Sequence, residues 1–131
     1  MTVTMEMPER PCIAVIDDDQ SVRESVVSLI ESVGYEATFF GSAEEFLNSP
    51  HIDRMNCLIL DVRLPGISGL QLYSQIKASK LQIRTIFITA HVDEAARAWA
   101  MEAGAMAFLY KPFRAGALLS ALQTAAPKTY P

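Results

Sequence analysis

The amino-acid sequence predicts a doubly wound α/β fold, in which helices cover both faces of a five-stranded parallel sheet. Roughly five units of a short strand followed by a helix succeed one another along the chain. The strand segments are almost uniformly apolar, as they are in a parallel sheet that is buried on both faces. With 131 residues, the chain is long enough for one compact core and too short for two. Right-handed crossovers then make the sheet doubly wound.

The first predicted unit joins a strand at residues 12–16 to a helix that begins at Gln20. Residues 12–16 (CIAVI) form an apolar run that stops at three aspartates, as a buried strand does at the edge of a sheet. From Gln20 to Val33 the apolar residues recur at helical spacing, and Gly34 stands where a helix-ending glycine belongs. We expect Asp19 to cap this helix.

The second unit begins with residues 35–40, which are aromatic and β-branched and therefore favour a strand. Ser42 and Glu45 follow at the spacing of a capping box, in which each side chain accepts a hydrogen bond from the other residue's backbone. A short helix should begin there.

The third unit repeats the pattern of the first. Residues 57–60 (CLIL) form an apolar strand that ends at Asp61. After a turn containing proline and glycine, Ser68 and Gln71 form a second capping box and predict the next helix.

The last two units follow in the same order. Residues 85–89 predict the fourth strand, Asp93 can cap an alanine-rich helix, and Gly104 can end it. Residues 106–109 predict the fifth strand. The final helix carries apolar residues at Leu118, Leu119 and Leu122.

The composition excludes several classes of protein. The net charge is -4 and no cluster of Lys or Arg breaks the acidic trend, so we expect no direct contact with nucleic acid. No apolar run reaches the roughly 20 residues that cross a bilayer, and the opening segment is not a basic leader, so we expect a cytoplasmic protein without membrane contact. Two cysteines, Cys12 and Cys57, are too few for a disulfide framework and lie within apolar runs.

The predicted domain occupies residues 11–126. Residues 1–10 have the composition of a flexible amino-terminal tail, and residues 127–131 that of a carboxyl-terminal tail or the start of a linker. No linker interrupts the chain between them.

Polar side chains stand where the predicted strands end. They are Asp17, Asp18 and Asp19 after the first strand, Asp61 after the third, Thr89 at the end of the fourth, and Lys111 after the fifth. In an open α/β sheet, ligands bind outside the carboxyl ends of the strands. We therefore expect these residues to converge at one edge of the sheet.

The chemistry of these side chains indicates phosphoryl transfer. Several carboxylates in one pocket repel one another, and a divalent cation between them offsets that cost. Mg²⁺ is suited to the pocket because it prefers oxygen ligands and commonly binds one or two carboxylates together with phosphate oxygens. A carboxylate beside it can attack phosphorus, while the ion, Lys111 and Thr89 neutralise the charge of the transferred group.

Four blocks of the sequence resemble those of response-regulator receiver domains of two-component signalling. They are VIDDDQSVR at 15–23, LDVRLPGISG at 60–69, ITAH at 88–91 and AGAMAFLYKPF at 103–113. Each block is weak alone, but the set in this order is specific, and the resemblance extends from about residue 12 to about residue 125. The nearest subgroup is the nitrogen-fixation and nodulation regulators, whose receivers precede a helix-turn-helix domain. The resemblance implies a flavodoxin-like sheet with strand order 2-1-3-4-5.

The resemblance also implies the identity of the phosphorylated residue and of the metal ligands. Asp61 matches the phosphoryl acceptor. Asp17 and Asp18 match the acidic pair, with Asp18 the more direct ligand of Mg²⁺. The backbone carbonyl of Arg63 matches the third protein ligand of the ion.

Further matches concern the switch that follows phosphorylation. Thr89 matches the switch hydroxyl, Phe108 the aromatic switch, and Lys111 the phosphate-binding lysine. Pro112 matches the proline that family members join to this lysine by a cis peptide bond. Two departures leave this chemistry intact: Asp19 replaces the glutamate of many relatives, and Gly116 weakens the start of the last helix.

The output of such a receiver is expected on a face formed by the fourth helix, the fifth strand and the fifth helix. We assign Arg97 and Trp99 of the fourth helix to this face. Trp99 should be exposed because Ala98, Met101 and Ala105 are placed on the buried side. The partners implied are a histidine kinase, an output domain or downstream protein that controls transcription, and a second copy in a phosphorylation-dependent homodimer.

Two other functions are alternatives to this signalling switch, which modifies only itself and turns over no external substrate. Residues 17–21 resemble the nucleophile motif of the haloacid-dehalogenase phosphatases, with Asp17 as nucleophile. That family needs further acids after its lysine, and residues 112–131 contain neither Asp nor Glu. A degenerate receiver that only docks is disfavoured because no site residue is missing. His51 and His91 are interpreted as surface residues.

Overall fold

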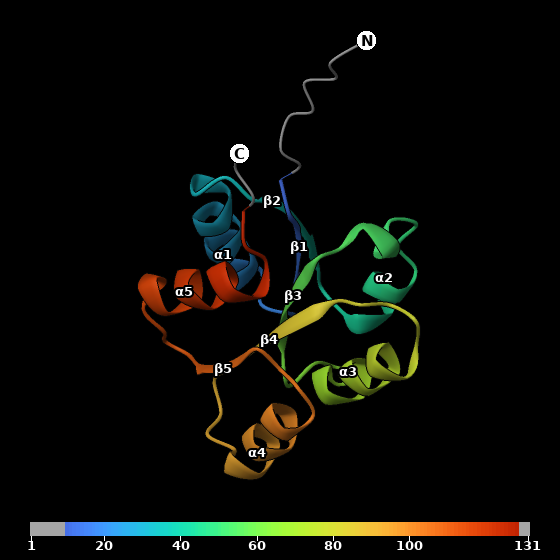
Figure 1. Cartoon of the computed structure of the whole chain (residues 1–131). Coiled ribbons are helices and arrows are strands. Elements are labelled where there is room, and N and C mark those ends of the chain that lie inside the picture. The colour runs from blue at the N-terminus through green and yellow to red at the C-terminus, as the bar shows by residue number, and fades with distance from the viewer. Residues whose placement is uncertain (1–9, 129–131) are drawn as a thin grey trace.

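The computed structural model describes residues 10–128, in which five strands alternate with helices (Figure 1). The elements are β1 (Cys12–Ile16), α1 (Gln20–Ser32), β2 (Glu36–Phe40), α2 (Ala43–Leu47), the 3₁₀ helix η1 (Ile52–Arg54), β3 (Cys57–Asp61), α3 (Gly69–Ala78), β4 (Arg84–Thr89), α4 (Glu94–Glu102), β5 (Ala107–Tyr110) and α5 (Ala115–Ala125). Every predicted strand and helix is present. The fifth strand lies one residue later than predicted.

The strands form one parallel sheet in the order β2-β1-β3-β4-β5. This order confirms the doubly wound fold, with the reversal between β1 and β3. Helices α1 and α5 cover one face, and α2, α3 and α4 cover the other (Figure 1). None of the helices in the described part of the chain combines the length and apolar character needed to cross a membrane.

Alternate residues of each central strand enter two separate hydrophobic cores. Ile13 and Val15 of β1 pack with Val26 and Ile30 of α1 on one face. Their neighbour Ile16 packs in the other core with residues of α2 and α3. Because successive strand side chains point to opposite faces, a strand between two helical layers must be apolar at every position. The edge strand β2 is only partly buried.

The predicted helix starts are confirmed with one difference. Asp19 caps α1 by accepting hydrogen bonds from two backbone amides, and Ser68 and Gln71 form a reciprocal capping box on α3. At α2, Ser42 accepts from the Glu45 amide as predicted, but the Glu45 carboxylate accepts from the amide of Gly41, one residue before the cap. The capping box predicted at Ser42 and Glu45 is therefore incomplete.

Helix α4 buries a different side from the one expected. Ala96 and Ala100 face the core, whereas Ala98 and Met101 are exposed. Ala105 is buried, but it lies beyond the end of the helix. The error arose because residues 98, 101 and 105 also follow helical spacing, so the spacing alone could not select between two overlapping stripes of small and apolar residues.

The two cysteines, the two histidines and the chain ends complete the comparison with the sequence. Cys12 and Cys57 are not joined in a disulfide, and His51 and His91 are exposed. At the end of the described chain, Lys128 donates a hydrogen bond to the Val33 carbonyl. Most of both predicted tails, residues 1–9 and 129–131, lies outside the described residues.

Candidate functional site

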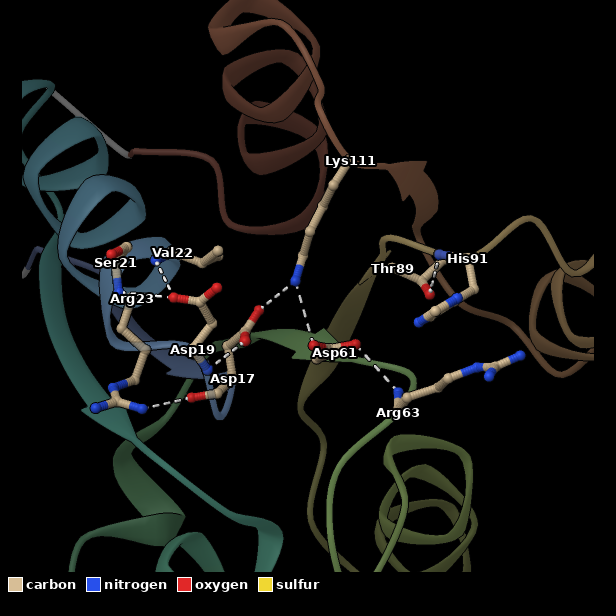
Figure 2. A network of polar contacts seen from close by, with 10 residues as sticks. All are labelled: Asp17, Asp19, Ser21, Val22, Arg23, Asp61, Arg63, Thr89, His91 and Lys111. Carbon is tan, nitrogen blue, oxygen red and sulfur yellow. Dashed lines mark hydrogen bonds and ion pairs between the residues drawn. The ribbon is translucent and has the colours of Figure 1, made fainter.

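The polar residues at the strand ends meet at one edge of the sheet, as the sequence predicted. Asp61 is the last residue of β3 and pairs in register with Ile88 of β4, one residue before Thr89. Asp17 directly follows β1, and Lys111 directly follows β5. Figure 2 shows Lys111 extending from its loop between the carboxylates of Asp17 and Asp61.

Lys111 bridges these two buried carboxylates. Its Nζ lies 2.7 Å from Asp17 Oδ2 and 3.2 Å from Asp61 Oδ2. Asp17 is fully buried and Asp61 is 6 % exposed, so the charges are held largely out of water. The peptide bond between Lys111 and Pro112 is cis, as the resemblance implied.

Asp17 is held at every polar atom. Its amide donates to the Phe40 carbonyl over 3.2 Å, and its carbonyl accepts from Arg23 Nη1 over 2.8 Å. One carboxylate oxygen accepts from the Asp19 amide, and the other accepts from Lys111. Asp17 is therefore anchored in the site through both its backbone and its side chain.

Asp18 contrasts with its neighbour because it is exposed. Asp17, Asp18 and Asp61 each offer a carboxylate oxygen, and these atoms lie within 4.8 Å of one another. Hard carboxylate oxygens at this spacing are suited to Mg²⁺. The acidic cluster is therefore compatible with a magnesium site, in which Asp18 has the carboxylate most accessible to an incoming ion.

The environment of Asp61 raises the pKa of its carboxyl group from 3.8 to about 6. Burial is the main cause, and the negative charge of Asp17 adds to it. The Arg63 amide, which donates to Asp61 Oδ1 over 3.1 Å, and Lys111 both act in the opposite direction. Burial alone would lower the pKa of Lys111, but its hydrogen bond to Asp17 and the two nearby negative charges outweigh burial and raise it.

The two residues assigned to the switch lie on neighbouring strands, Thr89 at the end of β4 and Phe108 in β5. Thr89 is buried, and its Oγ1 accepts a hydrogen bond from the His91 amide over 3.1 Å. Phe108 is also buried, with its ring centroid 5.9 Å from that of Phe87 and 5.5 Å from that of Tyr110. The two residues assigned to the switch are thus internal in this arrangement.

Arg97 and Trp99 leave α4 on different flanks, and their assignment to one output face stays a prediction. Residues two apart on a helix lie about 200° apart around its axis, so their side chains leave on opposite flanks. The Trp99 ring packs edge to face on Tyr73 of α3, with centroids 6.1 Å apart. On the other flank, Glu94 accepts a hydrogen bond from Tyr110 of β5 over 3.0 Å. Trp99 is exposed, as expected, but lies toward α3.

Three residues that support the site received no role from the sequence. Arg23 holds the Asp17 carbonyl, and Glu44 accepts a hydrogen bond from the Ile67 amide in the loop after β3. Gly69 opens α3 so close to β3 that an added Cβ would lie 2.0 Å from the Asp61 carbonyl oxygen. Arg23 and Gly69 are the last residues of two quoted blocks, whereas Glu44 lies in none, and no spacing rule indicated any of the three contacts.

Comparison with known proteins agrees with this geometry. Residues 13–123 match the family model of the response regulator receiver domain. The chain is 44% identical over 120 residues to Nodulation protein W of Bradyrhizobium diazoefficiens, covering 92% of this chain and 53% of that protein. It is 42% identical over 118 residues to the transcriptional regulatory protein FixJ of Azorhizobium caulinodans, covering 89% of this chain and 56% of that protein.

A solved structure gives the same result. The response regulator StyR superposes with a TM-score of 0.82 at 43% sequence identity, over 89% of this chain and 59% of that chain. The chain thus spans little more than half the length of these relatives. The match supports the signalling switch over the haloacid-dehalogenase phosphatase, and the relatives agree with the nitrogen-fixation and nodulation subgroup. The chain belongs to the family of response-regulator receiver domains, the phosphoryl-accepting switches of two-component signalling.

Proposed function

We propose that Asp61 is the residue that accepts the phosphoryl group, from a histidine kinase, and that Lys111 stabilises the charge transferred to it. The observation that carries this proposal is the bridge that Lys111 makes between two buried carboxylates at the centre of the sheet edge. Asp17 is fully buried, whereas Asp61 keeps some exposure and has the longer contact with Lys111, which favours Asp61 as the nucleophile.

The proposed step is a displacement at phosphorus. A carboxylate oxygen of Asp61 forms a bond to phosphorus, and the bond from phosphorus to the imidazole nitrogen of the kinase breaks, with its electron pair remaining on that nitrogen. The product is an aspartyl phosphate. Lys111 already contacts Asp61 at 3.2 Å, so its ammonium group can move from the carboxylate to the phosphoryl oxygens and stabilise their negative charge. The domain takes the phosphoryl group onto itself and turns over no external substrate.

Asp18, Asp61 and the backbone carbonyl of Arg63 would hold Mg²⁺, with Asp17 supporting the site through its neighbours. When bound, the ion would neutralise negative charge on the carboxylates and on the incoming phosphoryl group. The fit rests on the three carboxylates, whose oxygens lie within 4.8 Å of one another. The burial of Asp61 keeps water from competing for these charges.

We further propose that phosphorylation reshapes the face formed by α4, β5 and α5. Thr89 would leave the His91 amide and turn its hydroxyl toward the phosphoryl oxygens, which opens space for Phe108 to rotate. We assign Arg97 to this face, across which the hydrogen bond from Tyr110 to Glu94 links β5 to α4. The change is a population shift, so the unphosphorylated domain should already visit the active arrangement at a low level.

The output depends on the rest of the protein to which such a domain belongs. One relative is a transcriptional regulatory protein, and this chain spans only about half of its length. We propose that the reshaped face binds an output domain, a downstream protein or a second copy of the receiver, and that transcription is the process controlled.

Intact-mass measurement after treatment with acetyl phosphate and Mg²⁺ tests the acceptor. Wild type should gain one phosphoryl group, whereas Asp61→Asn should gain none. Asp53→Asn, an exposed acid in η1, serves as the control for loss of one charge and should behave as wild type. A stable phosphoryl group on Asp61→Asn would show that the assignment of Asp61 is wrong.

Amide hydrogen exchange with and without beryllofluoride, which mimics a phosphoryl group on Asp61, tests the switch. Exchange should change in α4 and around Phe108 when beryllofluoride binds. Sedimentation of the same samples reports whether a homodimer forms. If beryllofluoride binds and neither exchange nor association changes, the assignment of Asp61 is kept, but the proposed switch of the α4, β5 and α5 face is refuted.

A further inference from the structure

We propose that Arg23 is a positioning residue that fixes the peptide carrying Asp18 and thereby sets the affinity of the site for Mg²⁺. This inference rests on the proposed function, since it concerns the same metal site. It assigns a role to a side chain that touches neither the ion nor the phosphoryl group.

The contact that carries the inference is a hydrogen bond from a side chain to the backbone. Arg23 Nη1 donates to the carbonyl oxygen of Asp17 over 2.8 Å, six residues back along the chain (Figure 2). That carbonyl belongs to the peptide plane that joins Asp17 to Asp18, so a cation bound to it restrains the orientation in which Asp18 leaves the loop. A charged donor at this distance makes a stronger bond than a neutral one.

Asp18 needs this restraint more than Asp17 does. Asp17 is buried and anchored through both carboxylate oxygens, whereas Asp18 is exposed and makes no side-chain hydrogen bond among the residues that the structure describes. A ligand held in place before the ion arrives loses less conformational freedom on binding. Residues that orient metal ligands typically change metal affinity by tenfold or more when they are removed.

The guanidinium of Arg23 is itself confined. It lies 5.9 Å from the centroid of the Phe39 ring, an otherwise exposed aromatic of the edge strand β2. An added Cβ at Gly41 would lie 3.4 Å from Arg23 Nη1, so the backbone after β2 passes close to the guanidinium. Among the residues that the structure describes, the buried Arg23 Nε has no hydrogen-bond partner. A buried donor left unsatisfied has a cost, which the bond to Asp17 and the contact with Phe39 must offset.

Charge and positioning predict opposite effects when Arg23 is removed. A cation near the site repels Mg²⁺, so loss of its charge alone would tighten Mg²⁺ binding. Loss of the restraint on the peptide between Asp17 and Asp18 would weaken binding. The direction of the change therefore separates the two roles.

The experiment compares Arg23→Gln and Arg23→Lys with wild type, and uses Arg54→Gln as the matched control. Arg54 is an exposed arginine of η1, just before the amino end of β3, so its removal changes the net charge equally at the opposite edge of the sheet. Mg²⁺ affinity is measured by NMR titration of backbone amides. Exchange of the Asp18 amide is measured without metal, and phosphorylation by acetyl phosphate is measured over a range of Mg²⁺ concentrations.

For Arg23→Gln we expect the half-saturating Mg²⁺ concentration to rise about tenfold. The phosphorylation rate at saturating Mg²⁺ should stay within about twofold of wild type, because Arg23 acts on the metal site and not on phosphorus. The Asp18 amide should exchange faster without metal. Arg23→Lys should recover part of the affinity, and Arg54→Gln should behave as wild type. Unchanged or tighter Mg²⁺ binding by Arg23→Gln overturns the inference.

Urea unfolding establishes that each variant is folded. If Arg23→Gln does not fold, Phe39→Ala decides the question, because it leaves the charge in place and removes only the ring that confines the guanidinium. We then expect about threefold weaker Mg²⁺ binding, and no change overturns the inference. If wild type and Arg54→Gln take up no phosphoryl group on Asp61, it is the proposed function that fails.

Discussion

Lys111 lies closer to Asp17 than to Asp61, at 2.7 Å against 3.2 Å, although the two aspartates lie 94 and 50 positions away in the sequence. The ammonium group of Lys111 therefore contacts two buried carboxylates, and its shorter contact is with Asp17. Burial, together with the negative charge of Asp17, therefore raises the pKa of Asp61 to about 6, and Lys111 offsets this only in part.

Replacement of Asp61 should stabilise the fold in metal-free buffer. Because the pKa of Asp61 is about 6 in the folded protein and 3.8 is its ordinary value, the folded state binds the proton more tightly, and stability falls as pH rises between these values. At pH 7, which is above both pKa values, the full destabilisation of the fold by ionised Asp61 is present. Asp61→Asn should then raise the free energy of unfolding by about 1–3 kcal/mol, as measured by urea denaturation. The gain should disappear below about pH 4, and a gain that persisted there would contradict this origin.

Removal of Lys111 should destabilise the fold through Asp17. Lys111→Met leaves the fully buried carboxylate of Asp17 without its cation, at a cost of about 3–5 kcal/mol. The double variant Lys111→Met with Asp17→Asn should lose much less than the sum of the two single variants, because no unpaired charge then remains. Additive losses in the urea-denaturation cycle would show that the pair is not coupled.

Mg²⁺ binding should depend on Asp18 more than on any other exposed acid. Asp18→Ala removes the accessible carboxylate of the cluster and should lower the affinity about tenfold or more. Asp53→Ala removes an exposed acid elsewhere and should have little effect. Titration of amide chemical shifts with Mg²⁺ measures both variants, and equal affinity in Asp18→Ala and wild type would refute the role given to Asp18.

Two glycines should respond in opposite directions to replacement by alanine. Gly69→Ala places a Cβ 2.0 Å from the Asp61 carbonyl oxygen, so β3 and α3 must move apart at a cost of about 2 kcal/mol or more. Gly116 lies in the first turn of α5, where no atom of residues 10–128 comes within 4 Å of an added Cβ. Gly116→Ala should therefore stabilise the domain by about 0.5 kcal/mol. Thermal denaturation distinguishes the two, and similar changes in melting temperature would contradict the packing argument.

The two cysteines should differ in reactivity. Burial raises the pKa of the Cys57 thiol to about 12, so almost no thiolate is present at pH 8 and the thiol is shielded as well. Cys12 is only partly buried. A thiol reagent should therefore modify one equivalent in the folded protein and two after unfolding, and Cys12→Ser should abolish the reaction of the folded protein. Rapid modification of folded Cys12→Ser would show that Cys57 becomes exposed.

Much of the fold could be predicted because its signals are local. The apolar runs, the caps at Asp19 and Ser68, and the helix-ending Gly34 depend on neighbours a few positions away. The buried side of α4 could not be predicted in this way. Two stripes of small and apolar residues, one with Ala96 and Ala100 and one with Ala98 and Met101, both fit helical spacing. The packing of Ala96 and Ala100 against the core selected one of them.

The sequence alone determined which residues stand at the ends of the strands and that a parallel sheet would bring them to one edge. Only the tertiary structure decided what each of these residues contacts. Lys111 bonds closely to Asp17, Arg23 holds the Asp17 carbonyl, and Trp99 packs toward α3. The physical reason is that such contacts depend on side-chain direction and on the register between elements far apart in the chain, and these are set by the packing of the two cores.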